Sequence, residues 1–397
     1  MRKIGVFGGT FNPIHNGHVL AILEFAEKMQ LDLLYVIPAA IPPHKQVPDG
    51  SPDAKTRLKM VTSAVKELPY VRVSDIELKR EGKSYTSDTL RELKAIHPDD
   101  ELYLLVGTDS FLKLDTWHEP EVICALATLV CAHRDDDPED LLSKQGVRLK
   151  ELYNAESVIL NNQYEEISSS EVRRMLAFRC AESYLPEPVS RMIAEKNLYG
   201  FSKNHTGLPF EQLKAESLAL HKESRVSHVI GCSETAAELA KRYGANVTDA
   251  ARAGILHDVT KALTEEQHII VCRKYGYTLS DYDRSKAKLL HAITGSLIAK
   301  HIFGENEAVV DAIRWHTTGK TNMNTLEKII YIADYMEPSR DFPGVAQLRK
   351  TTYEDLDAAM LMGLTMTTDM LKRRGLEIDE RSLAALAYFS DKKNGGN

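Results

Sequence analysis

The first half of the chain alternates short apolar runs with longer segments of helical periodicity. Two of the longer segments, residues 18–30 and 54–68, have the spacing of amphipathic helices. The apolar runs predict strands at residues 4–7, 33–37, 71–73, 102–106, 128–131 and 158–160. Strands that alternate with helices indicate βαβ units, in which helices cover both faces of a parallel sheet. We therefore expect an α/β domain over residues 1–200.

The pattern changes near residue 200. Beyond it, almost no β-rich run occurs, and amphipathic segments predict an all-α domain over residues 215–390. The stretch GFSKNHTGLP, residues 200–209, combines glycine, proline and polar residues, so we expect a linker over residues 201–214. The tail DKKNGGN, residues 391–397, is expected to be flexible. The predicted helices include residues 233–243, 248–256, 290–302 and 326–335.

Length, charge and cysteine content narrow the class of protein. The chain has 397 residues, enough for two domains, and its net charge of −7 argues against a nucleic-acid-binding surface. The 5 cysteines are widely spaced and include no C-x-x-C pair, which favours a reducing compartment over a disulfide framework. No apolar run is long enough for a membrane span. We expect a cytoplasmic protein without membrane or nucleic-acid partners; the sequence sets no oligomeric state and allows a homo-oligomer.

A glycine turn and two histidines follow the first predicted strand. The segment reads GGTFNPIHNGH from Gly8 to His18. Glycines let the backbone approach a phosphate, and the N-terminus of the next helix offers unpaired N–H groups and a partial positive charge. His15 and His18 are three residues apart, so both imidazoles lie on one helical face and can donate to phosphoryl oxygens. A plain turn with two surface histidines is the alternative, and the order strand, turn, H-x-G-H argues against it.

A second candidate phosphate site opens a helix late in the same half. The segment ISSSEVR spans residues 167–173, and Ser168 and Glu171 have the spacing of a capping box. These serines either only cap the helix or form, with Arg173, a phosphate cradle opposite the first. The first motif makes binding the favoured interpretation. The candidate ATP- and phosphate-binding residues are Gly8, Gly9, Thr10, Phe11, Ser168 and Ser169.

These segments resemble the nucleotidyltransferase family that carries an H-x-G-H motif and an I-S-S-T-x-x-R-like motif. Within it, residues 1 to about 200 look like bacterial nicotinate-nucleotide adenylyltransferase, which implies a Rossmann-like sheet. Ser170 departs from the family, which commonly has threonine there. Further matches are PPHK at residues 42–45, SYT at 84–86, GTDS at 107–110 and WH at 117–118.

The resemblance implies adenylyl transfer. The phosphate of nicotinate mononucleotide would attack the α-phosphorus of ATP in line, so that deamido-NAD forms and pyrophosphate leaves. Such a reaction needs positioning and charge stabilisation rather than a covalent intermediate. His15 and His18 would hold the ATP phosphates, and Mg²⁺ would accompany the triphosphate. Lys45 and Arg173 would neutralise the developing charge.

The same resemblance indicates where the nicotinate nucleotide binds. Thr86 and Trp117 are expected to contact the pyridine ring by hydrogen bonding and stacking. Asp109 either binds the same nucleotide or is only a structural turn residue. A preference for nicotinate over nicotinamide does not follow from these residues.

Histidines and aspartates recur in or beside the predicted helices of the second half. Such ligands suit iron, manganese or zinc. Four His and two Asp are enough for two metals bridged by one carboxylate, for which Asp258 is the natural candidate. Asp258 and Asp334 each follow an apolar run, where a carboxylate is costly unless it is paired or metal-bound. The set is His228, His257, Asp258, His291, His316 and Asp334, while His221, His268 and His301 are assigned no role.

Four segments of the second half resemble the HD-domain phosphohydrolases, most closely the bacterial symmetrical diadenosine tetraphosphate (Ap4A) hydrolases. They are LHDVTK at residues 256–261, HAITG at 291–295, HTTG at 316–319 and ADYMEPSR at 333–340. The resemblance implies that the six residues are metal ligands, that Asp258 and Lys261 are catalytic, and that Lys261 and Arg340 contact the polyphosphate. It also implies cleavage of Ap4A into two ADP at a di-iron centre, although ligand type alone does not separate iron from manganese or zinc.

Other functions stay open at this point. The first half could adenylylate another acceptor such as phosphopantetheine, against which the PPHK, GTDS and WH segments argue. The second half could cleave a dNTP or a guanosine alarmone, or it could sense nucleotides without cutting them. The presence of all six ligand residues favours catalysis over sensing.

Overall fold

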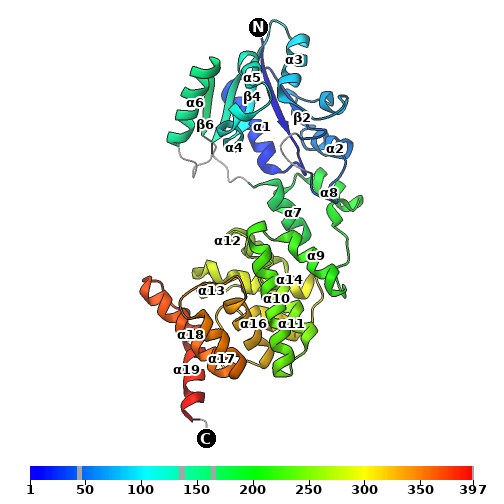
Figure 1. Ribbon diagram of the computed structural model, residues 1–397. Helices are drawn as coiled ribbons and strands as arrows, with labels where there is room; N and C mark the ends of the chain where they lie inside the picture. The colour runs from blue at the N-terminus through cyan, green and yellow to red at the C-terminus, as the bar shows by residue number, and fades with distance from the viewer. Residues whose placement is uncertain (43–46, 134–138, 162–166, 396–397) are drawn as a thin grey trace. The chain divides into compact units, whose positions relative to one another are not determined.

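Two compact units make up the chain, Met1–Lys203 (unit 1) and Asn204–Asn397 (unit 2) (Figure 1). The computed structural model describes residues 1–42, 47–133, 139–161 and 167–395. No helix in these ranges combines the length and the apolar character needed to cross a membrane.

Unit 1 is built on a six-stranded parallel sheet in the order β3-β2-β1-β4-β5-β6 (Figure 1). Its strands are β1 (Lys3–Gly9), β2 (Leu33–Pro38), β3 (Val71–Val73), β4 (Glu101–Gly107), β5 (Ala127–His133) and β6 (Ser157–Asn161). Its helices are α1 (Asn16–Met29), α2 (Ala54–Ala64), α3 (Thr86–Ile96), α4 (Thr108–Leu112), α5 (Pro120–Leu126), α6 (Glu139–Tyr153), α7 (Ser169–Ala177) and α8 (Glu187–Glu195). Short 3-10 turns lie at Ile76–Leu78, Leu114–Thr116, Glu182–Tyr184 and Leu198–Gly200.

Helices cover both faces of this sheet because successive strand side chains point to opposite faces. In β1, Ile4 and Val6 join a buried cluster that includes Leu90 of α3 and Ile123 of α5. Gly5 faces the other side, where a Cβ atom on it would lie 2.9 Å from Phe25 Cε1 of α1. The predicted Rossmann-like α/β sheet is confirmed.

The six predicted strands all form, and the differences lie at element ends. β1 continues through Gly9, so the turn begins at Thr10 rather than at the two glycines. The helix predicted over residues 54–68 is shorter, since α2 ends at Ala64. Pro69 disfavours helical backbone at the residue before it, which is consistent with an early end.

The strand order reverses between β1 and β4, which are parallel neighbours with Ile4 opposite Leu102 and Val6 opposite Leu104. Chain segments leave these two strands toward opposite faces of the sheet, which opens a crevice at their carboxyl ends. The turn starting at Thr10 and the segment after Gly107 therefore border one crevice.

Unit 2 is helical, and its described residues form no strand, as predicted (Figure 1). Its helices are α9 (Phe210–Leu220), α10 (Glu223–Tyr243), α11 (Val247–Leu256), α12 (Glu265–Lys274), α13 (Asp281–Ser285), α14 (Leu290–His301), α15 (Glu307–Trp315), α16 (Thr325–Met336), α17 (Val345–Glu354), α18 (Leu356–Arg373) and α19 (Glu380–Gly395), with a 3-10 turn at Ala287–Leu289.

The structure corrects the expected linker, residues 201–214. α9 begins at Phe210, inside that range, directly after Pro209 at its N-cap position. The helix is anchored in unit 2 because Leu213 is buried and Ser217 Oγ donates to the Ile255 carbonyl over 2.7 Å. The polar composition before Pro209 did not indicate that the following helix packs into unit 2.

The segment expected to be a flexible tail from residue 391 continues the last helix. α19 continues through it to Gly395. Ala385 and Phe389 are buried on one face of this helix, and Lys392 forms an ion pair of 2.6 Å with Asp357. Burial of the preceding turns therefore carries the helix beyond the point where composition suggests fraying.

Gly254 allows a close crossing of α10 and α11. A Cβ atom on Gly254 would lie 2.6 Å from Ser233 Cα and 3.0 Å from the Ser233 nitrogen. These are backbone atoms, which do not move aside as a side-chain tip would. His228 lies on α10 and His257 directly follows α11, so this crossing sets the distance between the two histidines.

We expect Gly254→Ala to destabilise unit 2 by about 1–3 kcal/mol, because overpacking outweighs the gain in helix propensity. Calorimetry of the full chain measures the effect. The matched control is Gly363→Ala in α18, where the added Cβ meets side-chain atoms alone, the nearest being the tip of Ile332 at 3.3 Å. The control should be neutral or stabilising by up to about 1 kcal/mol. Equal stability of the two variants would contradict the close crossing.

Candidate active sites

Two adjoining cavities open at the carboxyl ends of β1 and β4. The larger has a volume of about 630 Å³ and the smaller about 180 Å³. Both are bordered by the ends of the two strands and the segments that follow them. The lining residues that the cavities share are Phe7, Thr10, Leu105, Gly107 and Ser110.

His15 and His18 lie together in the wall of the larger cavity. His15 is the N-cap of α1, and the two ring centroids are 3.7 Å apart. The His15 backbone N–H donates to His18 Nδ1 over 3.3 Å. In the neutral ring of His18 the proton then resides on Nε2, which can donate to a ligand oxygen.

Burial keeps both imidazoles neutral at physiological pH. It lowers the pKa of His15 to about 3, and burial together with the neighbouring His15 lowers the pKa of His18 well below its usual value. Both ring nitrogens of His15 are buried without a hydrogen-bond partner in the described part of the chain. Buried polar atoms of this kind are normally satisfied, so an oxygen-rich ligand fits them.

The start of α7 faces the same cavity and holds the turn after β1. Arg173 Nη1 donates to the Asn12 carbonyl over 2.6 Å, and Ser169 Oγ donates to the Pro13 carbonyl over 3.0 Å. Ser168 and Glu171 form the capping box, with the Ser168 N–H 2.8 Å from Glu171 Oε2. Ser168 therefore caps α7, as its spacing to Glu171 predicted, and its role in phosphate binding stays a prediction.

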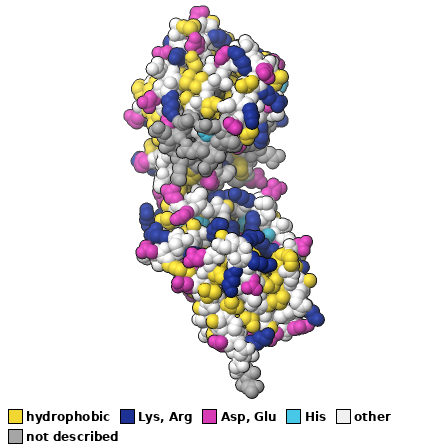
Figure 2. All heavy atoms as spheres, turned by 90° about the vertical axis from the view of Figure 1, so that its left-hand side faces the viewer, with side chains coloured by type: hydrophobic (Ala, Val, Ile, Leu, Met, Phe, Trp, Pro, Cys, Tyr) yellow, Lys and Arg dark blue, Asp and Glu magenta, His cyan; other side chains and the backbone are white. Residues whose placement is uncertain are grey.

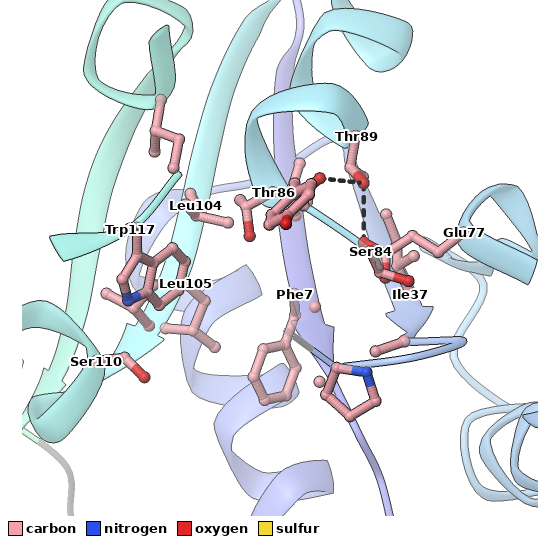
Figure 3. A pocket seen from close by; sticks show the side chains of 18 of the residues that line it. Phe7, Ile37, Glu77, Ser84, Thr86, Thr89, Leu104, Leu105, Ser110 and Trp117 are labelled. Atoms are coloured by element: carbon pink, nitrogen blue, oxygen red, sulfur yellow. Dashed lines mark hydrogen bonds between the residues drawn. The ribbon is translucent and has the colours of Figure 1, made fainter. Parts of the chain in front are cut away.

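The smaller cavity is bordered by Thr86, at the start of α3, and by Trp117. Figure 3 shows the Trp117 and Phe7 rings beside this cavity, with Thr86 close by. Glu77 lines it as well and accepts a hydrogen bond of 2.8 Å from Thr89 Oγ1. Burial raises the pKa of the Glu77 carboxyl. Aromatic walls beside a few polar groups suit a heteroaromatic ring.

In unit 2 the four predicted histidine ligands surround Asp258, which is only 2% exposed. Its Oδ2 lies 3.8 Å from His228 Nε2 and 3.5 Å from His257 Nε2. Its Oδ1 lies 3.4 Å from His291 Nε2 and 3.6 Å from His316 Nε2. Each carboxylate oxygen thus faces a different pair of histidines.

Asp334, on α16, completes one side of this cluster. Its Oδ1 lies 3.2 Å from His228 Nε2 and 3.8 Å from His257 Nε2. Ligand atoms around one ion at about 2.1 Å are roughly 3–3.5 Å apart in a tetrahedral arrangement. The spacing in unit 2 is close to that range.

The donor atoms of the cluster fit metal ions. His228 Nε2, His257 Nε2, His316 Nε2 and Asp258 Oδ1 are buried and make no hydrogen bond to the described residues. Buried atoms of this kind are costly unless something binds them. An ion on each side of Asp258 would satisfy all of them, so the residues present fit a two-metal centre.

Three cationic side chains border the same cluster. Arg225 contacts Asp258 Oδ2, Arg340 Nη2 lies 2.7 Å from Asp334 Oδ1, and Lys261 Nζ lies 2.9 Å from His291 Nε2. Burial lowers the pKa of Lys261 to about 8. All three are partly exposed, and Figure 2 shows lysine and arginine side chains gathered around exposed histidine atoms of unit 2. Cations beside these candidate metal ligands suit an anionic substrate.

Known proteins resemble each unit. A cytidylyltransferase-like family model matches residues 6–175, and an HD domain model matches residues 225–339. A relative from Lachnoclostridium phytofermentans, named "Probable nicotinate-nucleotide adenylyltransferase", is 36% identical over 204 residues, which are 50% of this chain and 100% of the relative. The chain belongs to the nicotinate-nucleotide adenylyltransferase family.

Both units of this adenylyltransferase-family chain have counterparts. A relative from Mycoplasma pneumoniae, named "Probable nicotinate-nucleotide adenylyltransferase/Ap4A hydrolase", is 30% identical over 338 residues, which are 84% of this chain and 88% of that protein. A crystal structure from Clostridium acetobutylicum is described as a predicted HD superfamily hydrolase involved in NAD metabolism. It is 38% identical, with a TM-score of 0.45, and the match covers 47% of this chain and 98% of that chain. The predicted fusion with an HD domain is confirmed.

Most of the predicted site residues of the adenylyltransferase unit lie around the two cavities. Gly8 and Gly9 line the smaller cavity rather than the one that holds the histidines. Asp109 lines the larger cavity, away from the Thr86 side. Lys45 lies outside the described residues.

Several residues that position the adenylyltransferase site were not predicted. Arg57 of α2 is 1% exposed and donates to the carbonyls of Thr10, Ala39 and Ala40. Tyr199 donates to Asn12 Oδ1 over 2.8 Å. No motif marks either residue; the nearest signal in the sequence is an arginine inside an otherwise apolar helical face.

Proposed function

We propose that unit 1 transfers AMP from ATP to nicotinate mononucleotide, forming deamido-NAD and pyrophosphate. The joined cavities at the β1–β4 crevice carry this proposal, because one offers phosphate donors and the other an aromatic wall. ATP would occupy the larger cavity and the pyridine ring the smaller one. The phosphate of nicotinate mononucleotide would then meet the α-phosphate of ATP at the wall that the cavities share, at Phe7, Thr10 and Gly107.

His15 and His18 would donate hydrogen bonds to the ATP phosphates as neutral rings. Arg173 can exchange the Asn12 carbonyl for a phosphoryl oxygen, and Lys45 would add a second cation. The reaction then depends on in-line positioning and on stabilising the charge that develops as pyrophosphate leaves. Mg²⁺ bound to the triphosphate would supply further charge neutralisation.

We propose that unit 2 hydrolyses Ap4A symmetrically to two ADP. The two oxygens of Asp258, each facing its own pair of histidines, carry the proposal of a two-metal centre. Two bound metal ions would supply a hydroxide and stabilise the phosphoryl charge. Arg225, Lys261 and Arg340 would hold the polyphosphate, each exchanging its present partner for a phosphate oxygen.

One assay of the purified full chain tests both proposals. With ATP, Mg²⁺ and nicotinate mononucleotide we expect deamido-NAD and pyrophosphate, and with Ap4A and metal we expect ADP alone. Release of ATP and AMP from Ap4A would overturn symmetrical cleavage. Phosphopantetheine and nicotinamide mononucleotide serve as competing acceptors for unit 1. Metal analysis of the protein as purified tests the assignment of iron.

A substrate panel separates the alternatives for unit 2. Turnover of a dNTP or a guanosine alarmone faster than Ap4A would replace the proposed substrate. Binding of Ap4A by the metal-loaded protein without any product would favour a nucleotide sensor. The four buried donor atoms that make no hydrogen bond to the described residues favour turnover, because a nucleotide can be sensed without a set of metal ligands.

A further inference from the structure

Glu337 directly follows α16 and is completely buried. Its Oε1 accepts a hydrogen bond of 3.0 Å from His228 Nδ1. The Ser339 backbone N–H donates to its Oε2 over 2.7 Å, and the Ser339 hydroxyl donates to its Oε1. The Glu337 carboxylate therefore contacts Nδ1 of His228, a candidate metal ligand, whereas Nε2 of the same ring faces Asp258.

Neighbouring residues leave space for the Glu337 side chain and hold its backbone in place. Gly231 lies one turn after His228 on α10, and a Cβ atom there would lie 2.7 Å from Glu337 Oε2. From α17, Arg349 donates to the backbone carbonyls of Met336, Glu337 and Arg340 over 2.8–2.9 Å. The segment that carries Glu337 is thus held from both sides.

The other three histidines of the cluster have neutral partners. The Nδ1 atoms of His257, His291 and His316 lie 2.7, 2.9 and 2.7 Å from the carbonyls of Gly254, Lys288 and Ile313. A carbonyl only accepts, so each ring carries its proton on Nδ1 and presents a bare Nε2. His228 has the same tautomer, but its acceptor is a carboxylate.

We propose that Glu337 is a positioning residue that makes one of the two metal positions of unit 2 the tighter one. This position, the His228 position, consists of His228 Nε2, His257 Nε2, Asp334 Oδ1 and Asp258 Oδ2. The other, the His291 position, consists of His291 Nε2, His316 Nε2 and Asp258 Oδ1. The inference rests on the proposed two-metal centre.

Two features favour the His228 position. It has four protein ligands, two of them carboxylates, whereas the His291 position has three ligands and shares one carboxylate. A carboxylate behind an imidazole increases its basicity as a ligand and fixes the ring orientation. Arg225 and Arg340 contact the carboxylates of the His228 position, and their charges oppose a cation there. Lys261 contacts His291 Nε2, and its charge opposes a cation at the His291 position. The His228 position thus has two opposing cations and the His291 position one, so the tighter binding that we propose depends on the additional carboxylate ligand and on Glu337.

The test is a titration of the metal-free full chain with Mn²⁺ alone. Calorimetry measures the heat of binding, and electron paramagnetic resonance measures the concentration of unbound Mn²⁺. We expect two binding steps in the native protein. Glu337→Gln keeps the size of the side chain and replaces the carboxylate by a neutral acceptor like those behind the other histidines. It should weaken the tighter step by about 10–100-fold and leave the weaker step unchanged. Glu337→Asp, which keeps the charge, should lose less affinity than Glu337→Gln.

Glu327→Gln is the matched control, because Glu327 is a buried carboxylate on the same helix that caps its first turn and pairs with Lys320. It should leave both steps unchanged. Calorimetric unfolding of the metal-free variants separates loss of folding from loss of binding. Equal weakening of both steps by Glu337→Gln, or no weakening in a folded variant, overturns the role of Glu337 but leaves the two-metal centre intact. A native protein that binds no Mn²⁺ overturns the two-metal centre itself.

Discussion

Replacing Asp258 by asparagine should lower the rate of Ap4A hydrolysis by at least about 1,000-fold, because loss of the proposed bridging ligand would affect both metal positions. The two Asp258 oxygens face different histidine pairs, so the single change removes a charge from both metal positions. The rate of ADP release and the metal content of the purified variant measure the effect. Adenylyl transfer should be unchanged, because the cavities proposed for it are lined by unit 1 alone.

Asp283→Asn is the control for this change. Asp283 is another buried aspartate of unit 2, but its partners are Ser280 and Arg381 rather than the metal cluster. This variant should keep its metal and its hydrolysis, with a modest loss of stability. Normal hydrolysis by Asp258→Asn would contradict the site, and a joint loss of both activities would contradict two separate sites.

The second large effect is expected for His18→Ala in unit 1. Removing a preorganised donor to a phosphoryl group should lower kcat/KM for adenylyl transfer by about 100–1,000-fold. The ring of His18 lies tilted against the ring of His15 and accepts a hydrogen bond from the His15 backbone N–H, so the substitution also loosens the first turn of α1. Steady-state kinetics with varied ATP and varied nicotinate mononucleotide measure the loss, and Ap4A hydrolysis serves as an internal reference.

His97→Ala serves as the matched control. His97 is a buried histidine of the same unit that contacts Arg2, Tyr35 and Asp100, and it lines neither cavity. This variant should lose stability without a specific loss of adenylyl transfer. If His18→Ala and His97→Ala reduced transfer equally, His18 would have a structural role only.

The strands were predictable because a buried parallel strand reads as a short continuous apolar run. Residues 71–73 form a strand with the predicted bounds, and the other five differ only at their ends. End positions depend on contacts beyond the local pattern. Gly8 and Gly9 read as a turn, yet β1 pairs through both with Ile37 and Pro38 of β2.

The candidate sites divide in the same way. H-x-G-H and the four HD-like segments carry their chemistry within a few residues, so their histidines and aspartates could be named from the pattern. The ADYMEPSR segment was recognised, but no role was predicted for Glu337. Its role depends on His228, which is 109 residues away in the sequence.

The order of apolar runs determined that the chain has one α/β unit and one all-α unit. The local motifs determined most of the residues that could bind phosphate or metal. Both kinds of signal depend on residues that are neighbours in the chain. The tertiary structure decided which atoms meet: Asp258 lies between two histidine pairs, Arg57 contacts the Thr10 carbonyl where the turn after β1 begins, and Glu337 contacts His228. Such contacts join segments far apart in the chain, and local periodicity holds no record of the distance between them.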